Sequence, residues 1–212
     1  MVAALAAIVL GHSVQGRPIV ALHLGNPSGP RVLVVGPIHG EEPAGLAVVR
    51  ALERHPPRHV DLWLVPTLNP DGLAAHSRDN ADGVDLNRNF GSMWRPNGTR
   101  GNLQWGGPHP FSEPETRIAR ALILRLRPRV TIWFHQPQAV VRAWGHSIAA
   151  ARRYARLAGA RFRALAWPNG TASNWQNHRF RDAVSYVVEL PPGPLAPAAA
   201  ERYAAAVDGA AD

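Results

Sequence analysis

The stretch VLVVGPIHGEEPAG, residues Val32–Gly45, decides how this chain is expected to fold. It begins with a run of apolar, mostly β-branched residues, which is typical of a buried strand. Gly36 and Pro37 end this strand, and a predicted helix starts near Pro43 and runs to about Arg54. The chain thus passes from a core strand, through a short polar loop, into a helix.

The loop between this strand and helix carries His39 and Glu42 in a His-x-x-Glu spacing. Ligands of open α/β sheets bind at the carboxyl ends of the strands, which is where this loop lies. An imidazole and a carboxylate held there can bind one divalent metal ion. Catalytic zinc usually takes three protein ligands and keeps a position open for water, so the chain must supply another ligand and a general base.

Strands and helices alternate along the rest of the chain. Core strands are predicted at Val60–Pro66, Val130–Phe134 and Ala183–Leu190, another strand at Phe162–Trp167, and further helices at 112–126, 147–158 and 198–207. This alternation predicts an α/β sandwich with a largely parallel central sheet. The length of 212 residues favours one domain, residues 1–212.

Three segments between these elements carry local signals. Asn69-Pro70-Asp71-Gly72 is a strong turn signal, and Ser112–Glu115 has the pattern of a capping box that opens the helix after it. Residues 74–111 and 167–179 lack periodicity, and we expect two irregular excursions there. Long loops inside a compact domain are usually functional.

Composition narrows the chemistry. Cysteine is absent, so disulfides and thiolate metal sites are excluded and only His, Asp and Glu remain as metal ligands. The net charge is +8 and all 23 basic residues are Arg. These Arg residues are scattered rather than clustered with aromatic residues, so we do not expect nucleic-acid binding. Arg favours bidentate capture of carboxylates, which fits an acidic ligand.

The apolar N-terminal stretch, Met1–Leu10, is too short to span a bilayer and lacks the basic region of a signal peptide. We expect an N-terminal strand there, with the remnant of an export signal as the alternative. No other segment approaches the length of a membrane span. The corresponding expectation is a cytoplasmic protein, or a secreted one if an export signal is missing from this N-terminus.

Two further core strands also end in a polar residue. His135 follows the strand Val130–Phe134, and Glu189 lies near the end of the last strand. Because parallel strands share one carboxyl edge, we expect His39, Glu42 and His135 to converge as metal ligands, a donor set that suits zinc. Glu189 would then take a proton from attacking water and pass it to the leaving amine. The alternatives are a structural histidine and a solvated or Arg-paired glutamate.

The segment Asp85-Leu86-Asn87-Arg88 supplies an anion-binding end for the predicted site. The Asn87 amide and the Arg88 guanidinium can together hold a carboxylate by charge-assisted hydrogen bonds. Asp85 could accept the free ring N–H of a ligating histidine. Arg78 could face the oxyanion that develops on a scissile carbonyl, the alternative being an ordinary surface arginine.

Taken in order, these motifs resemble the zinc metallocarboxypeptidase family, and the resemblance covers residues 32–190. It implies a three-layer α/β sandwich with an eight-stranded mixed sheet and one catalytic zinc per chain. By position it implies that the zinc ligands are His39, Glu42 and His135, and that the catalytic base is Glu189. It also implies that Asn87 and Arg88 bind the substrate carboxylate and that Asp85 is the partner of His39. Arg78 matches the carbonyl-polarising arginine of the family.

The compact form of the chain resembles the small bacterial branch of that family, which includes the murein peptide amidases. That branch cleaves the γ-D-glutamyl–diaminopimelate bond of cell-wall peptides, so the resemblance implies a small peptide substrate with a free carboxylate. No tyrosine matches the mobile tyrosine of the digestive enzymes. Trp175, in the segment Thr171–Asn177, is the residue we expect to recognise the substrate side chain, the alternative being a plain surface loop.

Two other functions compete with this hypothesis. An N-acyl amino acid deacylase of the aspartoacylase or succinylglutamate desuccinylase type shares the His-x-x-Glu, Asp-Leu-Asn-Arg and late-histidine order. A non-catalytic binding module would keep the fold without turnover. The complete set of expected ligands together with Glu189 favours an enzyme.

Overall fold

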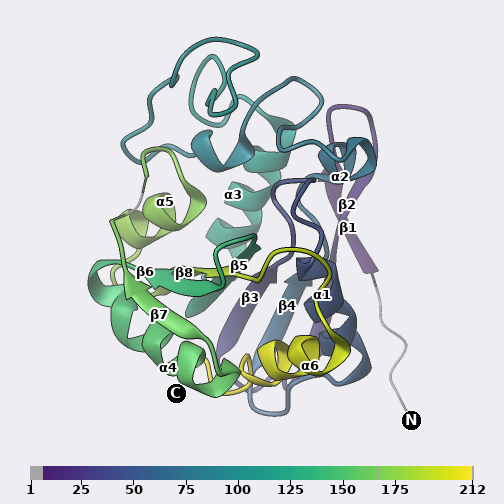
Figure 1. Ribbon diagram of the computed structural model, residues 1–212, viewed down its shortest axis with the longest axis vertical. Coiled ribbons are helices and arrows are strands. Elements are labelled where there is room, and N and C mark those ends of the chain that lie inside the picture. Colours follow the sequence, from purple (N-terminus) through teal and green to yellow (C-terminus); the bar gives the residue numbers. More distant parts are fainter. Residues whose placement is uncertain (1–6, 167, 212) are drawn as a thin grey trace.

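The computed structural model describes residues 7–166 and 168–211, and its strands form one sheet (Figure 1). The strand order is β1-β2-β4-β3-β5-β8-β6-β7. The strands are β1 (Ala7–His12), β2 (Pro18–Gly25), β3 (Arg31–Val35), β4 (Asp61–Val65), β5 (Val130–His135), β6 (Val140–Ala143), β7 (Arg161–Ala164) and β8 (Val184–Glu189). The helices are α1 (Gly45–Arg54), α2 (Pro70–Ala75), α3 (Pro114–Leu126), α4 (Ile148–Ala158), α5 (Ala172–Arg179) and α6 (Pro197–Ala205).

The centre of the sheet is parallel and its flanks are mixed. Strands β4, β3, β5 and β8 are neighbours and run parallel, whereas β1, β2 and β6 pair antiparallel with β2, β4 and β8 respectively. The central strands are almost wholly buried, as their continuous apolar sequences require. The prediction of a mixed, largely parallel sheet is confirmed.

The sheet lies between two helical layers (Figure 1). Helices α1, α4 and α6 cover one face, and α3 and α5 cover the other. Each face of the sheet has its own hydrophobic core, and the side chains of β3 alternate between the two. Val32 and Val34 point into the first core, and Leu33 and Val35 point into the second. The three-layer sandwich that the sequence predicts is therefore present.

The loop between β3 and α1 packs directly against the start of α2. A Cβ atom on Gly40 would lie 1.9 Å from the carbonyl carbon of Gly72, so only glycine allows the two backbones to approach this closely. The Asn69 side chain caps α2 by accepting a hydrogen bond of 2.8 Å from the Gly72 amide. The turn predicted at Asn69–Gly72 is thus wrong, because an N-cap followed by Pro70 starts a short helix.

Two other local predictions are also wrong. The Ser112 hydroxyl donates to the neighbouring Glu113 carboxylate rather than capping, and α3 begins at Pro114 without a side-chain cap. Most of the stretch expected to be irregular at 167–179 forms α5, although Trp167 lies outside the described residues. This helix has no apolar periodicity in its sequence because many of its buried side chains are polar. Gln176, for example, donates to the Thr131 hydroxyl at 2.8 Å.

The edge of the sheet departs from the sequence predictions. Strand β6 was not expected at all, because it has only four residues and follows closely after β5. Strand β7 replaces the strand expected at Phe162–Trp167 and ends at Ala164, with Trp167 outside the described residues. Strand β1 agrees with the expected N-terminal strand from Ala7 onward. Across residues 7–166 and 168–211, no helix is long and apolar enough to cross a bilayer.

The excursion between α2 and α3 is held in place by one buried asparagine, Asn89. Its amide nitrogen donates to the carbonyls of Gly106 and His109 and to the Ser112 hydroxyl, at 2.7, 3.0 and 2.8 Å. Its amide oxygen accepts from the Thr116 hydroxyl at 2.6 Å. Asn89 thereby connects the excursion to the first turn of α3.

Replacing this anchor should destabilise the protein. We expect Asn89→Ala to lower the free energy of unfolding by about 3 kcal/mol, because several buried polar groups lose their partner at once. The control is Asn102→Ala, whose exposed side chain accepts from the Gln104 amide at 3.0 Å, and which should cost under about 0.5 kcal/mol. Urea denaturation measures both values. Equal stabilities of the two variants would contradict the assigned anchor.

Candidate metal centre and active site

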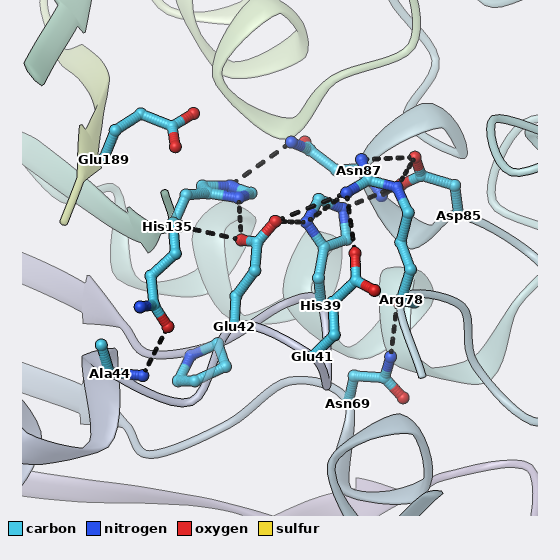
Figure 2. A network of polar contacts seen from close by, with 12 residues as sticks. His39, Glu41, Glu42, Ala44, Asn69, Arg78, Asp85, Asn87, His135 and Glu189 are labelled. Carbon is cyan, nitrogen blue, oxygen red and sulfur yellow. Dashed lines mark hydrogen bonds and ion pairs between the residues drawn. The ribbon is translucent and has the colours of Figure 1, made fainter. Parts of the chain in front are cut away.

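Three potential metal ligands meet at the carboxyl ends of β3 and β5. His39 and Glu42 come from the loop after β3, and His135 is the last residue of β5. One ligand atom from each lies within 4.8 Å of the others, and all three residues are buried. The two oxygens of Glu42 approach the Nδ1 atoms of His39 and His135, both at 2.9 Å (Figure 2). The structure thus brings the predicted ligands together.

Asp85 holds the first histidine in orientation. The Nε2 atom of His39 lies 3.0 Å from Oδ1 of Asp85, which leaves the Nδ1 atom facing the ligand cluster. The same Asp85 oxygen accepts from the amide of Asn87 at 2.9 Å and caps the short 3₁₀ helix Leu86–Arg88. The Asp85 partnership that the sequence suggested is therefore seen in the geometry.

The cluster creates a strongly negative environment. Burial alone would lower the pKa of His39, but the Asp85 and Glu42 carboxylates outweigh it and raise that pKa to about 9. Burial opposes ionisation of Glu42 and Asp85 too, yet both carboxyls have a pKa well below the usual range. His135 and His39 lower the pKa of Glu42, and His39 together with Arg78 and Arg88 lowers that of Asp85. Two imidazoles and a carboxylate that converge in this way form a donor set that fits a divalent cation such as zinc.

Glu189 stands beside this cluster at the end of β8. It is the register partner of His135 across the β5–β8 pair, and Figure 2 shows it near His135, with Arg78 and Asp85 at the opposite end of the network. Its Oε2 atom is buried and has no hydrogen-bond partner among the residues that the structure describes. Burial, together with the charge of Glu42, raises the pKa of Glu189. These are the surroundings expected of a proton-transferring carboxylate.

Arg78 lies at the ligand cluster and is not a free surface residue. Its Nε and Nη2 atoms donate to Oδ2 of Asp85 at 3.1 and 2.9 Å. Its Nη1 atom lies 3.2 Å from Nδ1 of His39 and 3.4 Å from Oε1 of Glu42. Asp85 thus positions a guanidinium group beside the expected metal position, where a scissile carbonyl oxygen would be polarised.

A cavity of about 260 Å³ opens next to the cluster. The metal-ligand candidates, Glu189, Arg78, Asn87 and Arg88 all line it. The nitrogen of the Asn87 amide lies 3.4 Å from Nε2 of His135, and its oxygen accepts from the Ala172 amide at 3.1 Å, which fixes Asn87 against α5. Arg88 donates to the Asn87 carbonyl at 2.9 Å.

The structure does not bring Trp175 to this cavity. Trp175 packs with Phe90, Phe111 and Phe180 in the core beneath α5, at ring-centroid distances of 6.0, 5.6 and 6.5 Å. Thr171, from the same segment, is on the cavity wall. Substrate recognition by this segment would therefore act through its N-terminal end.

Sequence reasoning missed two side chains of this site. Gln136 accepts from the Ala44 amide at 2.8 Å and donates to the carbonyls of Pro191 and Gly193, both at 3.0 Å, so it ties the start of α1 to the loop after β8. Arg142 lines the cavity from β6. The position of Gln136 directly after His135 could have indicated it as a site residue. Nothing in the sequence indicated Arg142, because its strand was not predicted.

Comparisons with known proteins agree with this geometry. The sequence profile of a family described as zinc carboxypeptidase matches residues 3–188. Murein peptide amidase A of Escherichia coli strain K12 is 32% identical over 149 residues, and the match covers 65% of this chain and 62% of that relative. The chain thus spans somewhat less than two thirds of the length of this relative. Murein peptide amidase A of Vibrio campbellii is 29% identical over 202 residues, covering 86% of this chain and 78% of that protein.

A solved structure extends the likeness to three dimensions. The crystal structure of murein-tripeptide amidase MpaA from Escherichia coli O157 superimposes with a TM-score of 0.76 at 25% identity. The superposition covers 96% of this chain and 90% of that chain. Fold and sequence therefore point to the same group of enzymes.

The Asp85 contact yields a test of the site. We expect Asp85→Asn to weaken zinc affinity by about 10–100-fold, because His39 loses the charged acceptor that orients it. Asp82→Asn is the matched control, since Asp82 is exposed on the same loop and should leave the affinity unchanged. Competition with a chromophoric chelator measures both. Equal zinc affinities for Asp85→Asn and the parent protein would remove Asp85 from the metal centre.

Proposed function

The chain belongs to the zinc carboxypeptidase family, and on that premise we propose that it hydrolyses an amide bond next to a free carboxylate in a small peptide. The observation that carries this proposal is the meeting of His39, Glu42, His135 and Glu189 at adjacent strand ends. Their cavity also contains Arg88, so one small space combines a metal-ligand set, a carboxylate base and an anion-binding group.

In this proposal, each chain holds one zinc ion through His39, Glu42 and His135. When bound, the ion supplies Lewis acidity, which makes water a stronger nucleophile and polarises a carbonyl group. Three protein ligands would leave a coordination position of the ion open, because Arg78 and Glu189 lie beside the cluster but are not ligands. No thiolate competes for the ion, since the chain has no cysteine.

Glu189 handles the proton in the proposed reaction. Its carboxylate takes one proton from the attacking water, whose oxygen bonds to the carbonyl carbon. When the C–N bond breaks, Glu189 returns that proton to the leaving nitrogen, and transfer of the remaining water proton to the amine leaves a carboxylate and an ammonium group as the products. The raised pKa of Glu189 suits a group that must both accept and release a proton.

Three polar residues position the substrate. Arg88 and Asn87 bind the free carboxylate of the leaving residue, which places the scissile bond near Glu189. Arg78, held by Asp85, donates to the carbonyl oxygen as negative charge develops on it.

The proposed substrate is a small peptide derived from the bacterial cell wall, with a γ-D-glutamyl linkage. Similarity to proteins named murein peptide amidase supports this choice, as does a cavity with room for a small ligand. These relatives lend no support to the deacylase alternative. Nor is a non-catalytic module favoured, because the ligand set and Glu189 are present together.

The base assignment is tested by Glu189→Gln. This variant should still bind one zinc per chain, since Glu189 is outside the ligand set, but its kcat on a γ-D-glutamyl dipeptide should fall by at least about 100-fold. Zinc content by plasma mass spectrometry and kcat by amine release give the two readouts. Glu201→Gln, on the exposed surface of α6, is the control. Retained turnover by Glu189→Gln would exclude Glu189 as the base.

The carboxylate anchor is tested by Arg88→Ala on two substrates. For a dipeptide with a free carboxylate, kcat/KM should fall by about 30-fold or more, which corresponds to the loss of a charge pair worth about 2 kcal/mol. For the same dipeptide with that carboxylate converted to an amide, the change should be small. An equal loss on both substrates would contradict the assigned role.

A further inference from the structure

One buried side chain connects the two parts of the site that the proposed reaction requires to act together. Gln136 directly follows His135, lines the cavity and is buried. Its backbone N–H donates to Oε2 of Glu42 at 3.2 Å, so its main chain already contacts one of the candidate ligands. The proposed reaction assigns no task to its side chain.

The side-chain amide of Gln136 forms three hydrogen bonds. Its oxygen accepts from the Ala44 backbone N–H at 2.8 Å, and its nitrogen donates to the carbonyls of Pro191 and Gly193, both at 3.0 Å. Exchanging the amide oxygen and nitrogen would set donor against donor and acceptor against acceptor, so these partners fix the orientation of the amide. Both of its N–H groups are used, which leaves the amide no donor for a substrate in the cavity.

These three contacts lie close in the chain to the two carboxylates of the proposed reaction. Ala44 follows Glu42 by two residues and directly precedes α1. Pro191 follows Glu189, the last residue of β8, by two residues. The Gln136 amide therefore connects the segment that carries a candidate metal ligand to the segment that carries the candidate base.

The chain after Glu189 depends on a hold of this kind. The Leu190 amide is bonded to the His135 carbonyl at 2.7 Å, but the next two residues are Pro191 and Pro192, which have no backbone N–H to donate. Their segment can be fastened through its carbonyl groups, and a side-chain donor such as the Gln136 amide does so.

We propose that Gln136 is a positioning residue for the reaction. It holds the chain after Glu189 against the chain after Glu42, and it thereby sets the place of the Glu189 carboxylate relative to the metal-ligand set. This inference rests on the proposed function and adds the side chain that aligns its two halves. A catalytic group displaced by about 1 Å costs on the order of 100-fold in rate, so the three hydrogen bonds of Gln136 bear directly on turnover.

Gln136→Met tests this role, because methionine is an unbranched side chain of similar length that forms none of the three hydrogen bonds. We expect kcat on a γ-D-glutamyl dipeptide to fall by about 30-fold or more. KM should stay within about 3-fold of the parent value, because Asn87 and Arg88 still bind the substrate. Gln136→Glu has the shape of glutamine and keeps an acceptor for the Ala44 amide but lacks both donors, and it should lose kcat in the same way.

Gln176→Met is the matched control for this experiment. Gln176 is also buried and donates to the Thr131 hydroxyl at 2.8 Å, so the same replacement removes a buried hydrogen bond between α5 and β5. Its kcat should stay within about 3-fold of the parent value. Equal falls in kcat for the two variants would overturn the proposal, since general loosening of the core would explain both. A rise in KM alone in Gln136→Met would do so too, because it would assign Gln136 to substrate binding.

Amide hydrogen exchange separates this proposal from the proposed function, because it needs no turnover. In zinc-loaded protein followed by NMR, the Leu190 amide should exchange at least about 10-fold faster in Gln136→Met than in the parent protein, and at the parent rate in Gln176→Met. Unchanged exchange at Leu190 in Gln136→Met overturns the proposal. If the parent protein does not hydrolyse the dipeptide while the exchange responds as expected, the proposed reaction fails and Gln136 keeps its role in holding the chain after Glu189.

Discussion

Parallel pairing of β3, β5 and β8 is the constraint on which the site depends. Parallel hydrogen bonding aligns the carboxyl ends of these strands, so residues that are far apart in the chain reach one edge of the sheet. The register sets His135 directly opposite Glu189, which puts a candidate ligand and a candidate base side by side. A slip of one residue in this pairing would turn one of the two side chains into the helical layers.

The buried charges at this edge depend on one another. Glu42 contacts both histidines, Asp85 contacts His39 and Arg78, and Arg78 returns to Glu42. Each charge alone would be expensive to bury, and the network compensates them in a closed chain of contacts. Glu189 stands outside this closed chain of contacts, and within residues 7–166 and 168–211 its Oε2 atom has no hydrogen-bond partner, so its carboxylate stays available for proton transfer.

The sequence predicted the parts of the molecule in which one physical signal dominates. Apolar runs identified β3, β5 and β8, and polar residues at their ends identified His39, His135 and Glu189. Helix α5 was missed because its buried polar side chains, such as Gln176, are satisfied by groups from a distant strand, which no local pattern reveals. Strand β6 was missed as a short strand at the flank of the sheet, and Arg142 was missed with it. Trp175 was expected at the site because its segment lies just before the strand that carries Glu189, but its indole packs against Phe90 and Phe111 in the core.

The anchoring of the excursion by Asn89 has a consequence for how this scaffold can vary. The segment that begins after Asn89 comes back to it, because the Asn89 side chain donates hydrogen bonds to Gly106, His109 and Ser112. The two ends of the segment are therefore held together at Asn89. Closing a longer loop costs little additional entropy once its ends are fixed. Insertions or exchanges within residues 91–104 would therefore leave the candidate ligands after β3 and at the end of β5 in their places, so this segment is a position at which the chain can be lengthened without rebuilding the sheet.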